Sequence, residues 1–255
     1  MSNFRLKYEI TPRYLTGPSQ RRPKTPLARC RFMVAHDTGN PGSTAAGNVS
    51  YYERTHADME QSAHLFVDDK QIIECVPFLT GPAEKAWHVV YNVTTDNVRY
   101  GVDANDAAGG VELCYGGSID LQEAYKRFVW VMAYSCYRYG LNPATDIAGH
   151  FQLDPARRTD PQNALRLLGK TFEGFVNDVV QEYIDCKEDE SVLNKEVANN
   201  IISSYLSPEW FKCDAERTKA QQKGRAADAE AWRKLRDYQK YLADELRKAS
   251  GQAVE

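Results

Sequence analysis

The chain has 255 residues, of which 42% are hydrophobic and 26% are charged, and its formal net charge is −3. This length and composition are ordinary for a globular protein with one sizeable core and room for a small additional module. The slightly acidic balance excludes the clustered basic excess of a dedicated nucleic-acid-binding surface, so we expect no nucleic-acid partner.

The sequence has no apolar run that approaches the length of a membrane span, and no apolar segment of a signal peptide follows Met1. We therefore expect synthesis in the cytoplasm and no membrane insertion. The six cysteines are far apart and form no Cys-x-x-Cys pair. In a chain without a secretion signal, this spacing predicts free thiols rather than disulfides.

The first part of the chain alternates short apolar runs with helical patterns. Residues 1–27 are polar and proline-containing, which predicts an arm along the surface, and a long polar loop is expected at 91–109. The strands predicted in chain order are 30–35, 62–67, 71–76, 86–90, 110–115 and 147–150. Helices are predicted at about 44–56, 121–139 and 163–183. Strands interleaved with helices indicate an α/β domain at 28–184, with a mixed central β-sheet flanked by helices.

The composition changes after this domain. Residues 185–191 are strongly charged and are predicted to form a linker, and residues 192–255 show helical periodicity. One helix is expected to end at Ser207-Pro208, and a later helix carries an apolar stripe from Trp232 to Ala249. This helical C-terminal module is too small to bury much surface alone. We expect it either to dock on the core or to pair with another chain.

Histidines end several of the apolar runs, where an α/β sheet presents chemistry to a crevice. His36 and His150 each end a predicted strand, and Asp160 follows ten residues after His150 on a loop between two prolines. Two imidazoles and one carboxylate leave a fourth position open, which is the arrangement of catalytic zinc. The alternative is that each histidine only satisfies a local hydrogen bond, and for a lone histidine that alternative is the better one.

Two charged residues are candidates for catalysis. Glu112 interrupts the apolar run Gly-Val-Glu-Leu-Cys, and it either points outward from an edge strand or faces a polar site as a general base. Arg158, two residues before Asp160, is either a surface charge or a group that stabilises a developing oxyanion. A guanidinium does not release its proton in proteins, so it cannot be the acid. The sequence does not separate Arg158 from Arg157.

Three further residues are expected near the substrate. Trp87 and His88 lie in the predicted strand 86–90 and are candidates for lining the cleft. His64 lies inside a predicted strand, where a supporting or packing role competes with substrate contact. Cys114 shares a strand face with Glu112, but its apolar neighbourhood offers no paired base for a nucleophilic role.

Several of these segments, taken in order, resemble one enzyme family. The segments are MVAHDTGNPGSTA, SAHLFVDDKQIIECVP, AWH, GVELC and GHFQLDPARRTDP, and they span about residues 28–183. They are similar to the zinc-dependent type 2 N-acetylmuramoyl-L-alanine amidases, which include phage endolysins and relatives of the peptidoglycan recognition proteins. The resemblance implies a mixed sheet flanked by helices, one Zn²⁺ ion, and cleavage of the amide between N-acetylmuramic acid and L-alanine in peptidoglycan.

The resemblance also implies roles at matching positions. The first and second histidine ligands fall on His36 and His150, and the third ligand falls on Asp160. The general base of the family falls on Glu112. Where the family often has a lysine, this chain has Arg158, which keeps the charge but could not serve as a neutral amine. The histidine that lines the family's cleft falls on His88, and we expect Trp87 and His64 to contact substrate with it.

The resemblance predicts a peptidoglycan hydrolase of the endolysin kind, which would act on the cell wall after release from the cytoplasm. The tail WRKLRDYQKYLADELRKASG is similar to C-terminal segments of endolysins from phages of Gram-positive hosts, which suggests wall binding or self-association. Two alternatives remain at this point. One is a non-catalytic peptidoglycan-binding protein of the same fold, and the other is a zinc peptidase that cuts within the stem peptide.

Overall fold

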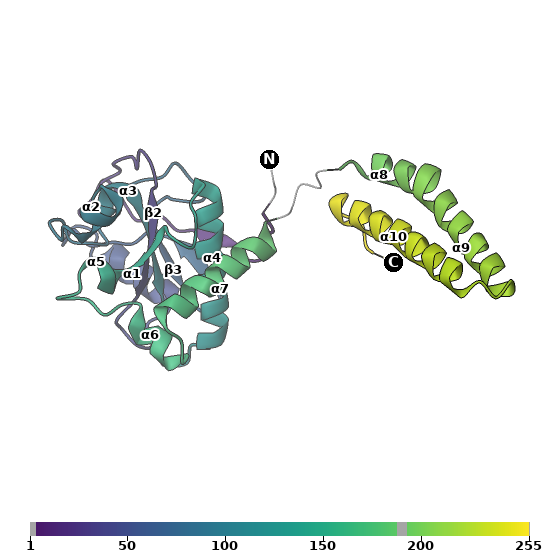
Figure 1. Cartoon of the computed structure of the whole chain (residues 1–255). Coiled ribbons are helices and arrows are strands. Elements are labelled where there is room, and N and C mark those ends of the chain that lie inside the picture. The colour runs from purple at the N-terminus through teal and green to yellow at the C-terminus, as the bar shows by residue number, and fades with distance from the viewer. Residues whose placement is uncertain (1–3, 188–192, 255) are drawn as a thin grey trace. The chain divides into compact units, whose positions relative to one another are not determined.

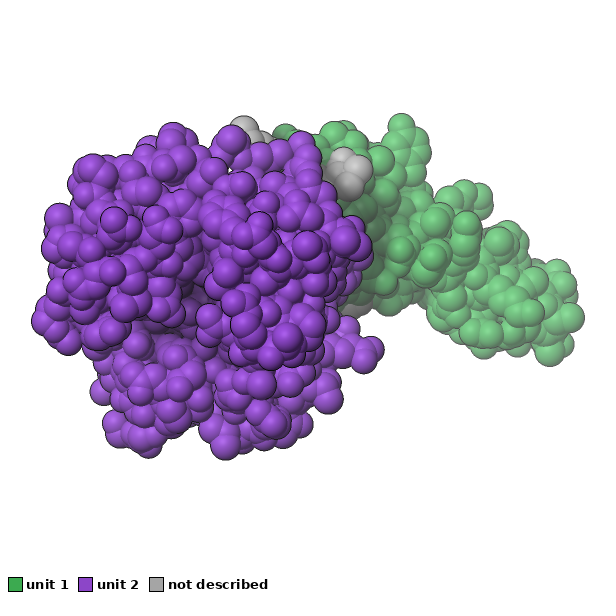
Figure 2. Space-filling model, turned by 90° about the vertical axis from the view of Figure 1, so that its left-hand side faces the viewer, with its two compact units in different colours: residues 1–3, 188–255 green, residues 4–187 purple. Residues whose placement is uncertain are grey.

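The computed structural model describes residues 4–187 and 193–254. These residues belong to two compact units, one formed by Phe4–Lys187 and one that includes residues 193–254 (Figure 2). Of the predicted linker 185–191, Asp185 and Cys186 belong to the last turn of a helix, and residues 188–191 lie outside the described residues.

The larger unit is built on one six-stranded sheet (Figure 1). The strands are β1 Ile10–Pro12, β2 Phe32–Asp37, β3 Leu65–Val67, β4 Ile72–Glu74, β5 Ala108–Leu113 and β6 Ile147–Gly149, in the order β1-β4-β3-β5-β2-β6. The hairpin pair β3–β4 is antiparallel, and the other neighbours are parallel. The predicted mixed sheet flanked by helices is therefore confirmed.

Helices cover both faces of this sheet. They are α1 Ala45–Arg54, α2 Thr95–Tyr100, α3 Ala104–Ala107, α4 Leu121–Tyr139, α5 His150–Leu153, α6 Gln162–Leu167 and α7 Phe172–Cys186. Helix α4 packs across β2, β3 and β5, and α7 packs against α4. Figure 1 shows α2, α3 and α5 on the other side of the sheet.

The two faces of β2 bury different apolar clusters. Phe32 and Val34 belong to a small cluster with residues of α3 and α5, whereas Met33 and Ala35 belong to the main core that includes α4. Successive side chains of a strand point to opposite faces, so His36 continues the face of Phe32 and Val34. The alternation thus delivers His36 to the side of the sheet that the short helices cover.

Three parts of this unit differ from the sequence prediction. The segment 1–27 is more than a surface arm, because β1 pairs with β4 and Leu15 is almost fully buried. Residues 86–90 form no strand, since the N–H groups of His88 and Val89 both donate to the Asn105 side chain instead of a ladder. The predicted loop 91–109 contains α2, α3 and the start of β5.

The predicted helix 163–183 is also two helices. Gly169 lies between α6 and α7 with a φ of +67°, a left-handed conformation that suits glycine and ends a helix. The break lets the chain turn after α6, so that α7 can pack on α4.

The C-terminal unit is entirely helical in its described residues. It consists of α8 Lys195–Ile201, a π-helical turn Ile202–Leu206, α9 Ser207–Gln222 and α10 Ala226–Ala249. The prediction that Ser207-Pro208 ends a helix is wrong: Pro208 lies in the first turn of α9, where a missing N–H costs no intrahelical bond. Among the residues described, no helix combines the length and hydropathy needed to cross a membrane.

Candidate metal and catalytic site

The strand register brings three distant residues to one level of the sheet. His36 in β2 pairs directly with Glu112 in β5, and Ala35 pairs with Gly149 in β6, so that His150 follows at the level of His36. Because directly paired residues of neighbouring strands share a face, His36 and Glu112 lie side by side. The carboxyl edge of β5, β2 and β6 is therefore where the predicted site residues gather.

Asp160 reaches this edge through the segment that follows β6. His150 begins the short helix α5, and the Phe151 N–H donates to the Asp160 carbonyl over 3.0 Å, which folds the segment back on itself. Asp37, next to His36, accepts hydrogen bonds from the Asn163 side chain at 3.0 Å and the Ala164 N–H at 3.1 Å. These bonds anchor α6 to β2. The sequence analysis did not assign a role to Asp37, although its place beside His36 was a signal.

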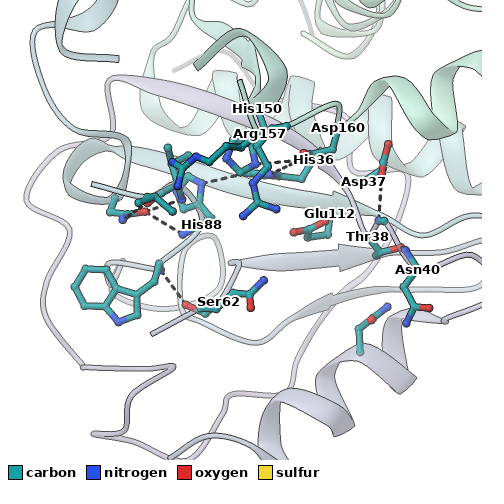
Figure 3. Close-up of a pocket in the computed structure, with 18 of the residues that line it drawn as sticks. His36, Asp37, Thr38, Asn40, Ser62, His88, Glu112, His150, Arg157 and Asp160 are labelled. Atoms are coloured by element: carbon teal, nitrogen blue, oxygen red, sulfur yellow. Dashed lines mark hydrogen bonds and ion pairs between the residues drawn. The ribbon is translucent and has the colours of Figure 1, made fainter. Parts of the chain in front are cut away.

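The three predicted ligands converge. The distance from Asp160 Oδ2 to His36 Nδ1 is 2.9 Å, and the distance to His150 Nδ1 is 3.1 Å (Figure 3). One ligand atom from each residue lies within 4.8 Å of the others, and all three residues are buried. Two nitrogens and one oxygen that converge in this way form a donor set that zinc binds.

The hydrogen bonding of these residues is incomplete without a cation. Burial lowers the pKa of His36 to about 4, so its ring is neutral at neutral pH. Burial alone would raise the pKa of Asp160, but the His150 and His36 rings lower it below its ordinary value. His150 Nε2 is buried and has no hydrogen-bond partner among the described residues. His36 Nδ1 and His150 Nδ1 face one carboxylate oxygen, and a divalent cation bound between them would have all three residues as ligands.

Glu112 lies beside this cluster, and the pKa of its carboxyl group is raised. Burial raises the pKa of Glu112 well above its ordinary value, and the charges of Asp160 and Asp37 raise it further. Its Oε2 atom is buried without a hydrogen-bond partner in the described part of the chain. A carboxyl group with a raised pKa near a polar cavity is suited to take up and release a proton.

The two adjacent arginines differ in their surroundings. Arg157 Nη2 lies 2.7 Å from Asp154 Oδ2, so its charge is paired within the loop. Arg158 forms no ion pair with another described residue, and its positive charge opposes the rise in the pKa of Glu112 and lowers the pKa of His36. The two arginines therefore differ in ion pairing.

A cavity of about 740 Å³ opens over these residues. His36, His150, Asp160, Glu112 and both arginines line it, together with Trp87 and His88. Its outer wall is aromatic, with the Trp87 and Tyr91 ring centroids 6.0 Å apart and Tyr51 and Tyr52 also lining the cavity. The sequence did not point to Tyr51 and Tyr52 of α1 or to Tyr91, because nothing in their local sequence distinguishes them from ordinary helix and loop residues.

His64 does not reach the cavity. Its ring is fully buried, its Nδ1 accepts from the Gly110 N–H at 2.9 Å, and its Nε2 donates to the Glu84 carbonyl at 2.9 Å. Burial lowers the pKa of His64 to about 4. Both nitrogens are thus used by backbone groups, and the prediction that His64 contacts substrate is wrong.

Solved structures share this fold. The chain is 23% identical to the catalytic domain of XlyA, covering 67% of this chain and 99% of that one with a TM-score of 0.52. It is 22% identical to a mutant endolysin from Bacillus subtilis, covering 68% and 99% with a TM-score of 0.54. It is 21% identical to the Staphylococcus aureus hydrolase AmiA in complex with its ligand, covering 70% and 85% with a TM-score of 0.57. No curated protein sequence is significantly similar to the chain.

The fold and the cluster at its carboxyl edge are those of an amide hydrolase. The sequence profile of the N-acetylmuramoyl-L-alanine amidase family matches residues 26–163, and the chain belongs to this family. It is thus an enzyme whose substrate is peptidoglycan, as the resemblance predicted.

Proposed function

We propose that the chain hydrolyses the amide between N-acetylmuramic acid and L-alanine with one Zn²⁺ ion held by His36, His150 and Asp160. The observation that supports this most directly is the convergence of two imidazole nitrogens on one carboxylate oxygen, at 2.9 and 3.1 Å. When bound there, zinc supplies a Lewis acid for the scissile carbonyl and lowers the pKa of a water molecule.

The residues around that ion divide the remaining chemistry. Glu112 accepts a proton from the attacking water, whose oxygen forms a bond to the lactyl carbonyl carbon. As the carbon–nitrogen bond breaks, Glu112 returns that proton to the departing alanine nitrogen, which leaves a free amino group. Arg158 places positive charge near the carbonyl oxygen, where negative charge develops, and it holds that charge throughout because guanidinium does not deprotonate.

The aromatic wall suits the substrate's sugar. Trp87 and Tyr91 line the cavity, and a pyranose ring offers C–H groups that pack on aromatic rings. His88 lines the same cavity, but both its nitrogens have partners inside the protein, so any contact with substrate is made by the ring edge.

We propose further that the enzyme acts as an endolysin and that its C-terminal unit mediates wall binding or self-association. The fold shared with the Bacillus subtilis endolysin supports the first part. The second part is supported by the large apolar side chains that the described C-terminal helices expose, among them Phe211, Leu235 and Tyr238.

The test is digestion of purified peptidoglycan. We expect new alanine amino termini by mass spectrometry, loss of lysis on addition of a chelator, and recovery with Zn²⁺ but not Mg²⁺, whose oxygen preference the two histidines do not meet. New amino termini from other stem-peptide residues would indicate a peptidase instead. Binding to the wall with no new termini under any metal condition would indicate a non-catalytic binding protein.

A further inference from the structure

A row of hydrogen bonds runs from the protein backbone into the ligand cluster. The Ala108 carbonyl lies 3.2 Å from His88 Nε2. His88 Nδ1 lies 3.1 Å from His36 Nε2, and His36 Nδ1 faces Asp160 (Figure 3). His88 is buried, and it connects a backbone carbonyl to a ring that is part of the metal cluster. The direction of the protons along this row decides which nitrogen of His36 has a free lone pair.

The carbonyl at the start of the row fixes that direction. A carbonyl oxygen can only accept a hydrogen bond, so the contact with Ala108 requires the proton of His88 on Nε2. In the neutral ring, Nδ1 then carries a lone pair and accepts from His36 Nε2–H. A neutral His36 with its proton on Nε2 has its Nδ1 lone pair pointing at Asp160, where a metal ion would bind.

This direction holds when a cation binds. If His36 carried its proton on Nδ1, it could donate to Asp160, but its Nε2 lone pair would then face His88, and the His88 Nε2 lone pair would lie against the Ala108 carbonyl oxygen. In the arrangement described above, the two acceptors in contact are instead His36 Nδ1 and Asp160 Oδ2, 2.9 Å apart. A cation between these two atoms relieves that contact, whereas nothing described relieves a contact between the His88 Nε2 lone pair and the Ala108 carbonyl.

The surroundings hold the His88 ring in this position. The Asn105 side chain accepts from the His88 N–H at 2.9 Å and the Val89 N–H at 3.0 Å, which fixes the backbone. A Cβ atom at Gly110 would lie only 2.7 Å from His88 Cγ, so the ring lies directly against the glycine backbone. The ring therefore has little freedom to turn away from His36.

We propose that His88 is a positioning residue. Its Nε2–H donates to the Ala108 carbonyl and its Nδ1 accepts from His36 Nε2–H, which leaves the His36 Nδ1 lone pair for the metal. This inference rests on the proposed zinc site. It differs from the role expected from the sequence, which was contact with substrate. Partners of ligating histidines commonly change metal affinity by about 10–100-fold when removed, and here that partner is a second histidine.

Two substitutions at position 88 separate this role from simple packing. In His88→Asn the amide oxygen occupies the place of Nδ1 and can still accept from His36 Nε2–H. In His88→Gln the amide lies near the place of Nε2, where it can donate to the Ala108 carbonyl, and the acceptor facing His36 is lost. His88→Ala removes both functions. Matched controls are His56→Asn and His56→Gln, because the His56 ring bonds only to the Glu53 carbonyl and does not line the cavity.

The measurement is zinc affinity of the full chain by competition with a chromophoric chelator, with circular dichroism melting to confirm folding. We expect His88→Ala and His88→Gln to bind Zn²⁺ about 10–100-fold more weakly. His88→Asn should stay close to wild type, and both His56 variants should equal it. Equal affinity in all folded His88 variants would overturn the proposal, and so would an equal loss in the asparagine and glutamine variants.

Nitrogen-15 NMR of the zinc-bound protein at neutral pH provides a second readout that packing would not move. We expect the His36 Nε2–H proton to be protected from exchange with water in the wild type and in His88→Asn, and to exchange faster in His88→Ala and His88→Gln, which lack its acceptor. A wild-type His36 without a protected Nε2–H would refute the row's direction. Because neither readout uses peptidoglycan, a failure of amidase activity would leave this inference standing, and its own failure would leave the activity unaffected.

Discussion

Replacing Glu112 with glutamine is expected to abolish most activity while making the metal-free protein more stable. The change removes the proton acceptor and keeps the side chain's size. A positioned general base typically contributes about 10²–10⁴-fold in rate, so kcat should fall by that range. The gain in stability arises because burial and the charges of Asp160 and Asp37 disfavour the ionised form of Glu112, and glutamine carries no charge.

The size and the pH dependence of the gain follow from the structure. A carboxyl group whose pKa folding raises by one unit costs about 1.4 kcal/mol of stability at high pH. We expect recovery of about 1 kcal/mol, which for a domain of this size raises Tm by about 2–4 °C. Because the pKa of Glu112 is raised in the folded state, the wild type loses stability as pH rises from the ordinary carboxyl pKa through the raised one. The advantage of glutamine should therefore be absent in acid and complete at high pH.

The assays are release of alanine amino termini from peptidoglycan and thermal unfolding of chelator-treated protein across pH. Glu173→Gln is the matched control, because Glu173 is exposed in the first turn of α7. Retained activity in Glu112→Gln would refute the role as base. A stability difference that is independent of pH would refute the argument from the buried carboxylate.

Three further outcomes are expected. Arg158→Ala should lower kcat by about 10²-fold, as loss of an oxyanion-stabilising group does, whereas Arg157→Ala should leave kcat nearly unchanged; equal losses would contradict the assignment. Burial lowers the pKa of both His36 and His64 to about 4, so each should add about 3 kcal/mol to a loss of stability as pH falls from 6.5 to 4, which urea unfolding of metal-free Glu112→Gln protein can measure; a stability that is flat over this pH range would contradict the burial of these rings. A chain ending at Lys187 should still cleave soluble muropeptides, because the large apolar cluster lies within the larger unit; failure of this shortened chain to fold would contradict that expectation.

Part of the candidate site could be predicted from residue types and their positions in the chain. His36 and His150 were recognisable because each ends an apolar run, and Asp160 because it follows on a polar loop. The structure brings these three together through the register of β2, β5 and β6. Glu112 was ambiguous between an exposed edge and a site-facing position until its pairing with His36 in the middle of the sheet was known.

Other features could not be read from the chain. His64 has the same local pattern as a site residue, but its ring is held by backbone groups of Glu84 and Gly110, which lie far from it in the sequence. Residues 86–90 have strand propensity, yet the Asn105 side chain takes the N–H groups that a ladder would use. Which hydrogen-bond partner a residue takes depends on which groups lie near it in the folded chain, and strand propensity carries no information about that.

The sequence alone determined the alternation of strands and helices, the family and the set of residues able to bind a metal, because these depend on side-chain type and on local periodicity. Only the tertiary structure decided which arginine is held in an ion pair, that His88 contacts His36, and that His36 and His150 both face Asp160. Those outcomes depend on contacts of a few ångströms between segments far apart in the chain, and folding is what creates such contacts.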